Sequence, residues 1–497
     1  MRDVLLDSMI LIHAVWKSFL LAHVKKHERV ICCNKKGGVV IMKKMCKGFV
    51  GLIVTILLVA CYQINYTQAA AKRNYDMLVP LKKVKVTKAI ARKNGDKITY
   101  FVDSIGLIEA QLSDKSVKEI KKLVGDNNIA MSKETSRDVD FKGNESIKSI
   151  HNKAATIFNF WPVQWDMKKI MENGRDYKYL PESSKITIGL VDSGVDYTHP
   201  ALKNSILRSG SINLVPKGGK DGKETDEKGL KDDIKDKLGH GTAVAGQLAS
   251  TQSIRGTYPG VKVHVYRVLG KLSSDPAWIM QGIIDSTNNG DSVINVSLGT
   301  YELINKDKPN EVLYKAWKRT VSYAYRNGSI IVSSVGEDSV NEDNSYDMLS
   351  IYKKVNNITN IQGKIKDVPA LLKNVVSVGS TGPDDTVSNF SNYGKKVTLF
   401  APGGDTSLYY KYGPEKWQQL DLTDKNLIAT TDLNGSYTYV YGTSFATPKV
   451  SAILAAYIAK TKQYKQPHKV INFVERKTDR NAYGLRIISG KILRSIK

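Results

Sequence analysis

Cysteine is nearly absent from this sequence, and its few positions all lie near one end. The 497 residues include 4 cysteines, at Cys32, Cys33, Cys46 and Cys61. Every later position lacks cysteine, which excludes a disulfide framework and a cysteine-based metal site from the main body of the chain. A body of this size can be stable on its hydrophobic core alone.

Acidic residues are scarce relative to basic ones. The sequence has 48 Asp and Glu against 74 Lys and Arg, a net charge of +26. Such a balance suits nucleic acid, an anionic membrane or a cell-wall polymer as a partner. Because no nucleic-acid-binding motif is present, we expect no nucleic-acid partner and a basic protein that works near an anionic surface.

Long apolar runs are also missing. The apolar stretch 49–60 is too short for a comfortable transmembrane span. Lysines precede this stretch, and together they are typical of an export signal, which we place at 42–70. Two cleavage sites compete. Residues 58–61 (Leu-Val-Ala-Cys) resemble a lipobox, which would leave Cys61 lipid-modified, whereas 67–69 (Thr-Gln-Ala) suit ordinary signal peptidase. We favour free secretion, with membrane attachment only through the signal or a lipid anchor.

Residues 1–41 precede this signal and look misplaced. Gly37 and Gly38 lie shortly before Met42, and glycine codons can spell a purine-rich ribosome-binding sequence. We therefore interpret 1–41 as a mis-assigned upstream extension and Met42 as the start of translation. Terminal sequencing of the protein before export tests this interpretation.

Residues 71–157 read as a small α+β unit followed by a polar linker. Residues 97–103 have the β-branched and aromatic content of a strand, and 127–131 could begin a second one. Residues 114–124 form an amphipathic pattern typical of a helix, with Asp114 or Ser113 as its cap. The alternative is a disordered linker throughout.

Residues 158–497 alternate between buried strands and helices. Continuous apolar runs indicate strands of a parallel sheet covered on both faces, and helical stretches separate them. This order predicts an α/β fold with a doubly wound, mostly parallel sheet. The expected strands are 185–191, 262–269, 292–297, 329–333 and 374–378, and the expected helices include 278–288 and 313–326.

Three short segments carry candidate catalytic residues in a fixed order. Asp192 lies in 191–194 (Val-Asp-Ser-Gly) and closes a predicted strand, so its carboxylate is expected at the carboxyl edge of the sheet. His240 opens 240–246 (His-Gly-Thr-Ala-Val-Ala-Gly), and Ser444 lies in 442–448 (Gly-Thr-Ser-Phe-Ala-Thr-Pro) before an apolar, alanine-rich stretch. Each segment alone is ordinary, as a turn, a loop or a helix cap.

Together, the three residues provide the chemistry of nucleophilic catalysis. Serine needs an adjacent base to act as a nucleophile at neutral pH, and His240 can serve as that base. Asp192 can fix the tautomer of His240 and stabilise its imidazolium form. Ser444 is expected at a helix amino terminus, where the helix dipole favours developing negative charge. The sequence therefore predicts a serine protease.

These segments resemble the subtilisin-like serine proteases, over about residues 161–457. Within that family, 164–170, 265–268 and 282–285 are most similar to the lantibiotic leader peptidases, which remove the leader from a modified precursor peptide. Further matches to the family are 196–202, 293–299, 388–394 and 401–404. The resemblance implies a peptide substrate, the pro-segment 71–157 as folding aid and intramolecular inhibitor, and a monomer.

The resemblance also implies the walls of the primary specificity pocket. One wall is Ser297, Leu298 and Gly299, which pairs with extended substrate as an added strand. The other wall is Ser334, Val335 and Gly336. No cofactor is required for the chemistry.

The family often binds structural calcium, but the metal ligands here are unknown. The charged loop 218–237 offers Asp226, Asp232 and Asp233 as candidates. Their spacing matches no EF-hand loop.

Glu337 departs from the family pattern. The family places an oxyanion-hole asparagine at this position, and an ionised carboxylate cannot donate a hydrogen bond as the amide does. Three accounts are open: Glu337 is held protonated and donates, the Ser444 amide suffices in a slower enzyme, or activity is lost. We favour a working protease, because the three candidate catalytic residues and their flanking segments are otherwise intact; convertases of this family with an acid here are known, so the departure is not disqualifying.

The acidic residues at and after position 337 also indicate the class of substrate. Glu337, Asp338, Glu342 and Asp343 favour a basic residue before the scissile bond, unless they form only a solvated loop. Residues 337–373 as a whole read as a polar surface insertion. We expect a secreted leader peptidase; the alternatives are a general extracellular subtilisin and an inactive leader-binding pseudoprotease.

Overall fold

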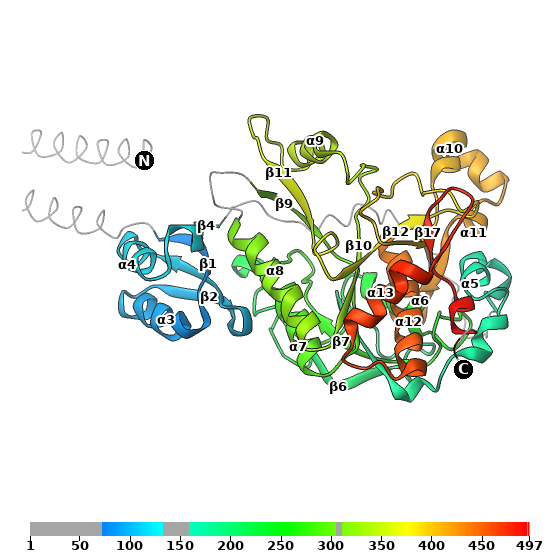
Figure 1. The fold of residues 1–497 in the computed structure, drawn as a ribbon, viewed down its shortest axis with the longest axis horizontal. Coiled ribbons are helices and arrows are strands. Elements are labelled where there is room, and N and C mark those ends of the chain that lie inside the picture. Colours follow the sequence, from blue (N-terminus) through cyan, green and yellow to red (C-terminus); the bar gives the residue numbers. More distant parts are fainter. Residues whose placement is uncertain (1–71, 133–158, 305–310, 495, 497) are drawn as a thin grey trace, which may run out of the picture. The chain divides into compact units, whose positions relative to one another are not determined.

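The computed structural model describes residues 72–132, 159–304, 311–494 and 496 (Figure 1). The predicted upstream extension 1–41, the predicted export signal with Cys61 and the predicted linker from residue 133 lie outside the described residues. Among the helices that are described, none is long and apolar enough to cross a membrane.

Residues 72–132 form an antiparallel sheet with two helices. The strand order is β2-β3-β1-β4, and Met77, Ile108 and Ile120 belong to the core between sheet and helices. The expected helix 114–124 is confirmed, and Ser113 is its cap, because its hydroxyl accepts the Ser116 N–H at 3.4 Å. The elements are β1 (Arg73–Leu78), α3 (Val84–Lys93), β2 (Lys97–Val102), β3 (Leu107–Leu112), α4 (Asp114–Val124) and β4 (Ile129–Met131).

A large sheet organises the rest of the chain, and it is parallel except at one edge. Its order is β16-β17-β13-β12-β10-β8-β5-β7-β6, with β16 antiparallel to β17. The five expected strands are confirmed within two or three residues at each end. The strands are β5 (Thr187–Asp192), β6 (Ile206–Asn213), β7 (Lys262–Arg267), β8 (Val293–Val296), β10 (Ile330–Ser334), β12 (Val375–Thr381), β13 (Leu399–Pro402), β16 (Asp479–Arg480) and β17 (Arg486–Ile487).

Helices cover both faces of this sheet, which explains why its strands are apolar throughout. Ile188 and Leu190 of β5 pack in one core with α6 (His240–Ala249) and α12 (Thr443–Thr461), and Val191 packs in the other with α7 (Pro276–Asn288) and α8 (Glu311–Arg326). Green α7 and α8 and orange α12 are seen on opposite sides in Figure 1. The remaining helices are α5 (Trp165–Ile170), α9 (Ser345–Val355), α10 (Ser407–Gln419), α11 (Thr423–Asn426) and α13 (Pro467–Lys477).

The insertion 337–373 is more ordered than a surface excursion. It contains α9 and β11 (Lys364–Val368), and β11 pairs with β9 (Thr300–Ile304) as an antiparallel ribbon. Met348, Tyr352 and Ile365 are buried in one cluster with Leu303. The insertion is therefore not only a polar surface excursion, because three spaced apolar side chains build this small core.

Candidate active site

The three candidate catalytic residues lie at element ends that the sheet brings together. Asp192 is the last residue of β5, which lies between β7 and β8 in the sheet. His240 is the first residue of α6, and Ser444 is the second residue of α12. Helices α6 and α12 share one core with β5. Segments far apart in the sequence thus meet at one edge of the sheet.

Asp192 and His240 are in direct contact. The distance between Asp192 Oδ1 and His240 Nδ1 is 2.7 Å, and the two residues are 0% and 5% exposed. Burial opposes protonation of the ring, but the adjacent Asp192 carboxylate outweighs it and raises the pKa of His240 above its ordinary value. This is the arrangement in which a carboxylate stabilises an imidazolium.

The amino terminus of α6 is held by Asp236, which the sequence analysis did not single out. Asp236 is buried, and its carboxylate accepts hydrogen bonds from the N–H groups of Gly239 and Thr242 at 2.9 Å each. It also accepts the hydroxyl of Ser193, the residue that follows Asp192, at 2.8 Å. One carboxylate therefore fixes both His240 and Asp192 in place. An acid four residues before a helix start is the signal that could have indicated it.

Ser444 is placed by contacts from both sides. Its hydroxyl donates to the carbonyl oxygen of Ser297 at 3.3 Å, and the Ser297 hydroxyl donates to the carbonyl of Ser444 at 2.8 Å. The ring centroids of His240 and Phe445, the residue after Ser444, are 5.6 Å apart. The nucleophile candidate thus lies between the histidine helix and one predicted pocket wall.

Glu337 lies directly over the amino terminus of α12. Its Oε1 accepts the Thr443 N–H at 2.9 Å, and a Cβ on Gly442 would approach that oxygen to 2.3 Å. Burial raises the pKa of Glu337 to about 7, while His240 and the N–H groups of Thr443 and Ser444 favour its charged form. The carboxylate therefore faces the Ser444 N–H that an oxyanion would need.

The predicted pocket walls leave the sheet side by side. Ser297, Leu298 and Gly299 follow β8, and Ser334 ends β10 ahead of Val335 and Gly336. Strands β8 and β10 are parallel neighbours, with Ser333 opposite Val296. Both predicted walls therefore leave the carboxyl edge of the sheet next to each other.

The calcium candidates do not form a cluster. Among the described residues, no three His, Cys, Asp or Glu side chains are grouped to hold a metal ion. Asp233 instead pairs with Lys237, with 3.1 Å between Oδ2 and Nζ. In the same loop, Glu227 pairs with buried Arg267, and this lowers the pKa of Glu227 to about 2 against the effect of burial. Structural calcium therefore remains a prediction.

A buried ion pair joins α5 to the helix that carries Ser444. Lys449 on α12 and Asp166 on α5 are each fully buried, with 2.9 Å between Nζ and Oδ2. Lys449 also donates to Gln247 of α6 at 2.6 Å. The segment 164–170, one of those that suggested the leader peptidases, thus helps to position α6 and α12.

A buried carboxylate–imidazole pair, with a serine on a neighbouring helix terminus at the carboxyl edge of a parallel sheet, defines a serine endopeptidase with an α/β fold. The chain belongs to the subtilase family, whose model matches residues 183–486.

Two relatives are similar over most of this chain. The epidermin leader peptide-processing serine protease EpiP of Staphylococcus epidermidis is 37% identical over 403 residues, which cover 79% of this chain and 85% of that protein. The nisin leader peptide-processing serine protease NisP of Lactococcus lactis subsp. lactis is 37% identical over 379 residues, which cover 75% of this chain and 54% of that protein. The chain thus spans about half the length of NisP.

Solved structures agree on the fold. The crystal structure of EpiP from Staphylococcus aureus matches with a TM-score of 0.75 at 28% identity, and covers 85% of this chain and 98% of its own. The structure of NisP from Lactococcus lactis matches with a TM-score of 0.65 at 37% identity, and covers 68% of this chain and 95% of its own. The predicted subtilisin-like α/β fold is therefore confirmed.

Proposed function

We propose that this protease removes the leader peptide from a lantibiotic precursor and cuts after a basic residue. The observation that carries the proposal is the 37% identity to a leader peptide-processing protease across 79% of the chain. The aligned region is longer than the peptidase domain alone. The two pocket walls support it, because an extended leader can pair with 297–299 as an added strand.

The proposed mechanism follows from the contacts of the site. The Ser444 hydroxyl attacks the scissile carbonyl while His240 accepts its proton, and His240 then protonates the leaving amine. Asp192 holds the Nδ1 side of the ring and stabilises its charged form. The acyl-enzyme is hydrolysed by water in a second step, again with His240 as base.

This function is tested by incubating the protein separately with a lantibiotic precursor that carries its leader and with casein. We expect mass spectrometry to show a single cut at the leader junction of the precursor and intact casein. Digestion of casein at many sites would favour a general extracellular protease. Glu337 favours a further candidate, a leader-binding pseudoprotease, which would bind the precursor without cutting it.

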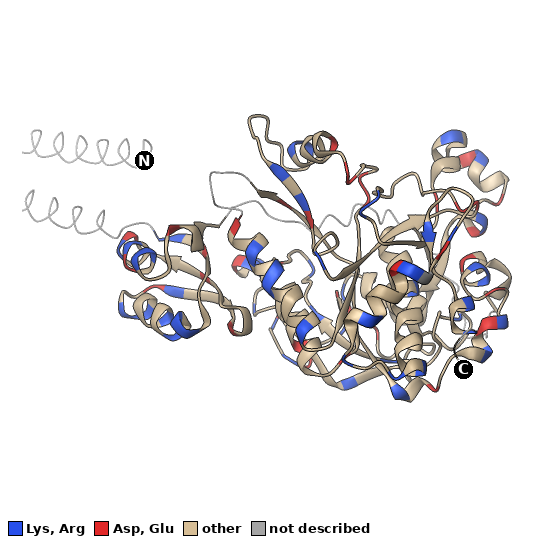
Figure 2. Ribbon diagram, viewed as in Figure 1, with Lys and Arg blue, Asp and Glu red and all other residues tan. Residues whose placement is uncertain are grey.

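We propose that the protein is exported as a zymogen and works as a monomer near an anionic surface. The export signal in the sequence and the basic charge support this. Figure 2 shows Lys and Arg gathered on α3, α4 and α8. Free secretion remains favoured over a lipid on Cys61.

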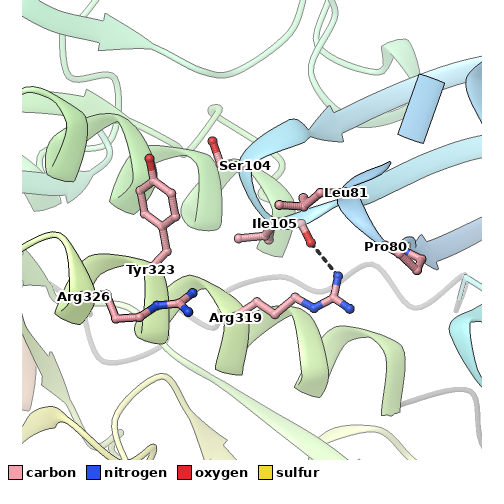
Figure 3. Close-up of a pocket in the computed structure, with 7 residues that line it drawn as sticks. All are labelled: Pro80, Leu81, Ser104, Ile105, Arg319, Tyr323 and Arg326. Atoms are coloured by element: carbon pink, nitrogen blue, oxygen red, sulfur yellow. Dashed lines mark hydrogen bonds between the residues drawn. The ribbon is translucent and has the colours of Figure 1, made fainter. Parts of the chain in front are cut away.

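We also propose that residues 72–132 act as an inhibitory pro-segment, and Arg319 of α8 is a candidate clamp for it. Arg319 Nη1 donates to the carbonyl oxygens of Ile105 at 2.8 Å and Val79 at 3.1 Å. Figure 3 shows Arg319 beside Ile105. Both residues line a cavity of about 250 Å³. Pro80, Leu81, Ser104, Ile105, Arg319, Tyr323 and Arg326 line this cavity.

Replacing Arg319 with alanine is expected to loosen the pro-segment. Hydrogen bonds from a charged donor contribute more than neutral ones, so losing two should raise the opening equilibrium of residues 72–132 by about 10-fold or more. Hydrogen exchange in the full chain carrying Ser444→Ala measures this opening. Arg326→Ala is the matched control, because Arg326 lines the same cavity but its Nε donates within α8, to Ser322. Equal exchange in both variants would contradict the clamp.

A further inference from the structure

One face of α8 carries two arginines and a tyrosine toward residues 72–132. Arg319, Tyr323 and Arg326 lie at positions i, i+4 and i+7, a spacing that puts side chains on one face of a helix. Together with 80–81 and 104–105 they line the cavity of about 250 Å³. One water takes roughly 30 Å³ in the liquid, so the cavity has room for a small ligand.

The lining of this cavity is positively charged. Its charged residues are Arg319 and Arg326, and no lining residue is acidic. Figure 3 shows the guanidinium of Arg326 extending toward Arg319. Arg319 Nη1 donates to two carbonyl oxygens of residues 72–132, and Arg326 Nε donates to Ser322. In the part of the chain that the structure describes, neither arginine forms an ion pair and their other N–H groups have no acceptor.

The lack of a counter-ion is most costly at Arg319. Its side chain is half-buried, and burial lowers the pKa of its guanidinium below the ordinary value. The two carbonyl groups satisfy Nη1 but do not neutralise the charge. Charges that are removed from water are usually paired. An anion from outside the chain would supply the missing partner.

Two acids close to the cavity in sequence are paired elsewhere. Asp103 directly precedes one wall segment and pairs with Lys88, with 2.6 Å between Oδ1 and Nζ. Glu311, at the start of α8, pairs with Lys315, with 2.9 Å between Oε2 and Nζ. Lys318 adds further positive charge to α8, and Figure 2 shows basic residues along this helix. The surroundings of the cavity therefore favour an anion.

We propose that this cavity binds an oxyanion of the phosphate type between Arg319 and Arg326, and that the bound anion holds residues 72–132 on the peptidase domain. A guanidinium presents a planar fork of N–H donors that matches phosphate oxygens. Leu81 and Ile105 make part of the wall apolar, which strengthens the attraction between the charges. Because the walls come from both parts, the site is lost when they separate.

The effect on the zymogen follows from mass action and rests on the proposed role of residues 72–132 as a pro-segment. A ligand that binds only the closed form lowers the opening equilibrium by the factor 1 + [L]/Kd. At ten times the Kd, the pro-segment should therefore open about 10-fold less often. Zymogen activation should be slower in phosphate than in its absence.

Hydrogen exchange of residues 72–132 in the full chain carrying Ser444→Ala tests the site. Sodium phosphate is added at constant ionic strength, balanced with sodium chloride, because salt alone screens surface charges. Calorimetry with the same chain gives the Kd. We expect phosphate at ten times the Kd to slow this exchange by about 10-fold.

Two variants show whether the cavity is responsible. We expect Arg326→Gln to reduce the effect of phosphate to within about 2-fold, because it removes one guanidinium of the pair. Lys318→Gln is the matched control, since it removes the same charge from α8 but lies outside the cavity, and it should retain the full effect. Each variant is compared with itself, with and without phosphate, so a change in its unliganded exchange does not enter.

A second arm distinguishes two sources of the phosphate group. Vesicles of phosphatidylglycerol replace inorganic phosphate, with vesicles of zwitterionic phosphatidylcholine as control. Protection by inorganic phosphate assigns the site to the free ion. Protection by phosphatidylglycerol vesicles alone, lost in Arg326→Gln, assigns it to a lipid headgroup. Protection in neither arm, or protection of equal size in Arg326→Gln, would overturn the proposal.

Fluorophosphonate labelling of Ser444 in the otherwise unchanged protein separates the anion site from the inhibitory role. If phosphate protects residues 72–132 from exchange but labelling does not change, the anion site stands and the inhibitory role fails. If labelling rises when processing removes residues 72–132, but phosphate gives no protection, the inhibitory role stands and the anion site is refuted.

Discussion

Glu337→Asn is expected to raise kcat by about 10²–10³-fold at pH 8, the factor that one oxyanion-hole donor typically contributes. In the starting protein, the Glu337 carboxylate accepts the Thr443 N–H at 2.9 Å and faces the Ser444 amide. An ionised carboxylate there competes with the oxyanion for the same donors and repels it. Asparagine supplies a donor and removes the charge.

The gain should depend on pH in a defined direction. Burial raises the pKa of Glu337 to about 7, so the group is protonated and able to donate below that pH and charged above it. Its charge also helps to raise the pKa of His240, which must be neutral to act as a base. The starting protein should therefore lose activity as pH rises above about 7, and Glu337→Asn should abolish that alkaline decline.

Measurements of kcat with one peptide across pH 5–9 test both the gain in kcat and its dependence on pH. Glu337→Gln, an amide of the original length, should recover part of the gain. The double variant with Ser444→Ala must be inactive if the gain passes through the proposed nucleophile. A drop in kcat at every pH in both amide variants would show that Glu337 itself serves the reaction.

Ser444→Ala and His240→Ala are each expected to lower kcat by about 10⁶-fold, and the double variant by no more, because residues that act as one catalytic unit lose their effect together. That factor is the one known for the triad of subtilisin itself. The structure supports such a unit, since Asp192 contacts His240 at 2.7 Å and His240 lies beside Phe445.

Asp192→Asn should be milder, at about 10⁴-fold, because the base and nucleophile remain but the tautomer of His240 is wrong. Single-turnover kinetics with the same peptide measure all four variants. Thermal unfolding of each variant provides the control for stability. Additive losses from Ser444→Ala and His240→Ala would contradict a shared mechanism.

Much of the fold was predictable because its signals are local. The run 185–191 is continuously apolar and became β5, and the pattern at 114–124 became α4 with Ser113 as its cap. Three elements of the amino-terminal unit, β1, α3 and β3, were missed, although α3 is amphipathic and Lys-rich like α4 and the two strands are as long as β2. The order Asp192, His240, Ser444 indicated a protease because these residue types lie in small-residue contexts at predicted element ends.

Residue identity and order by themselves therefore determined the class of enzyme, the α/β fold class and five strands of the large sheet. The tertiary structure alone decided which other side chains hold the catalytic segments and residues 72–132 in place. Asp236 contacts the segments of both His240 and Asp192, and Arg319 donates to two carbonyl groups of residues 72–132. Apart from the bond between Asp236 and Thr242, which are close in sequence, these contacts join residues that are far apart along the chain. They arise when elements that are distant in the sequence pack together, and a sequence pattern does not specify which distant elements come into contact.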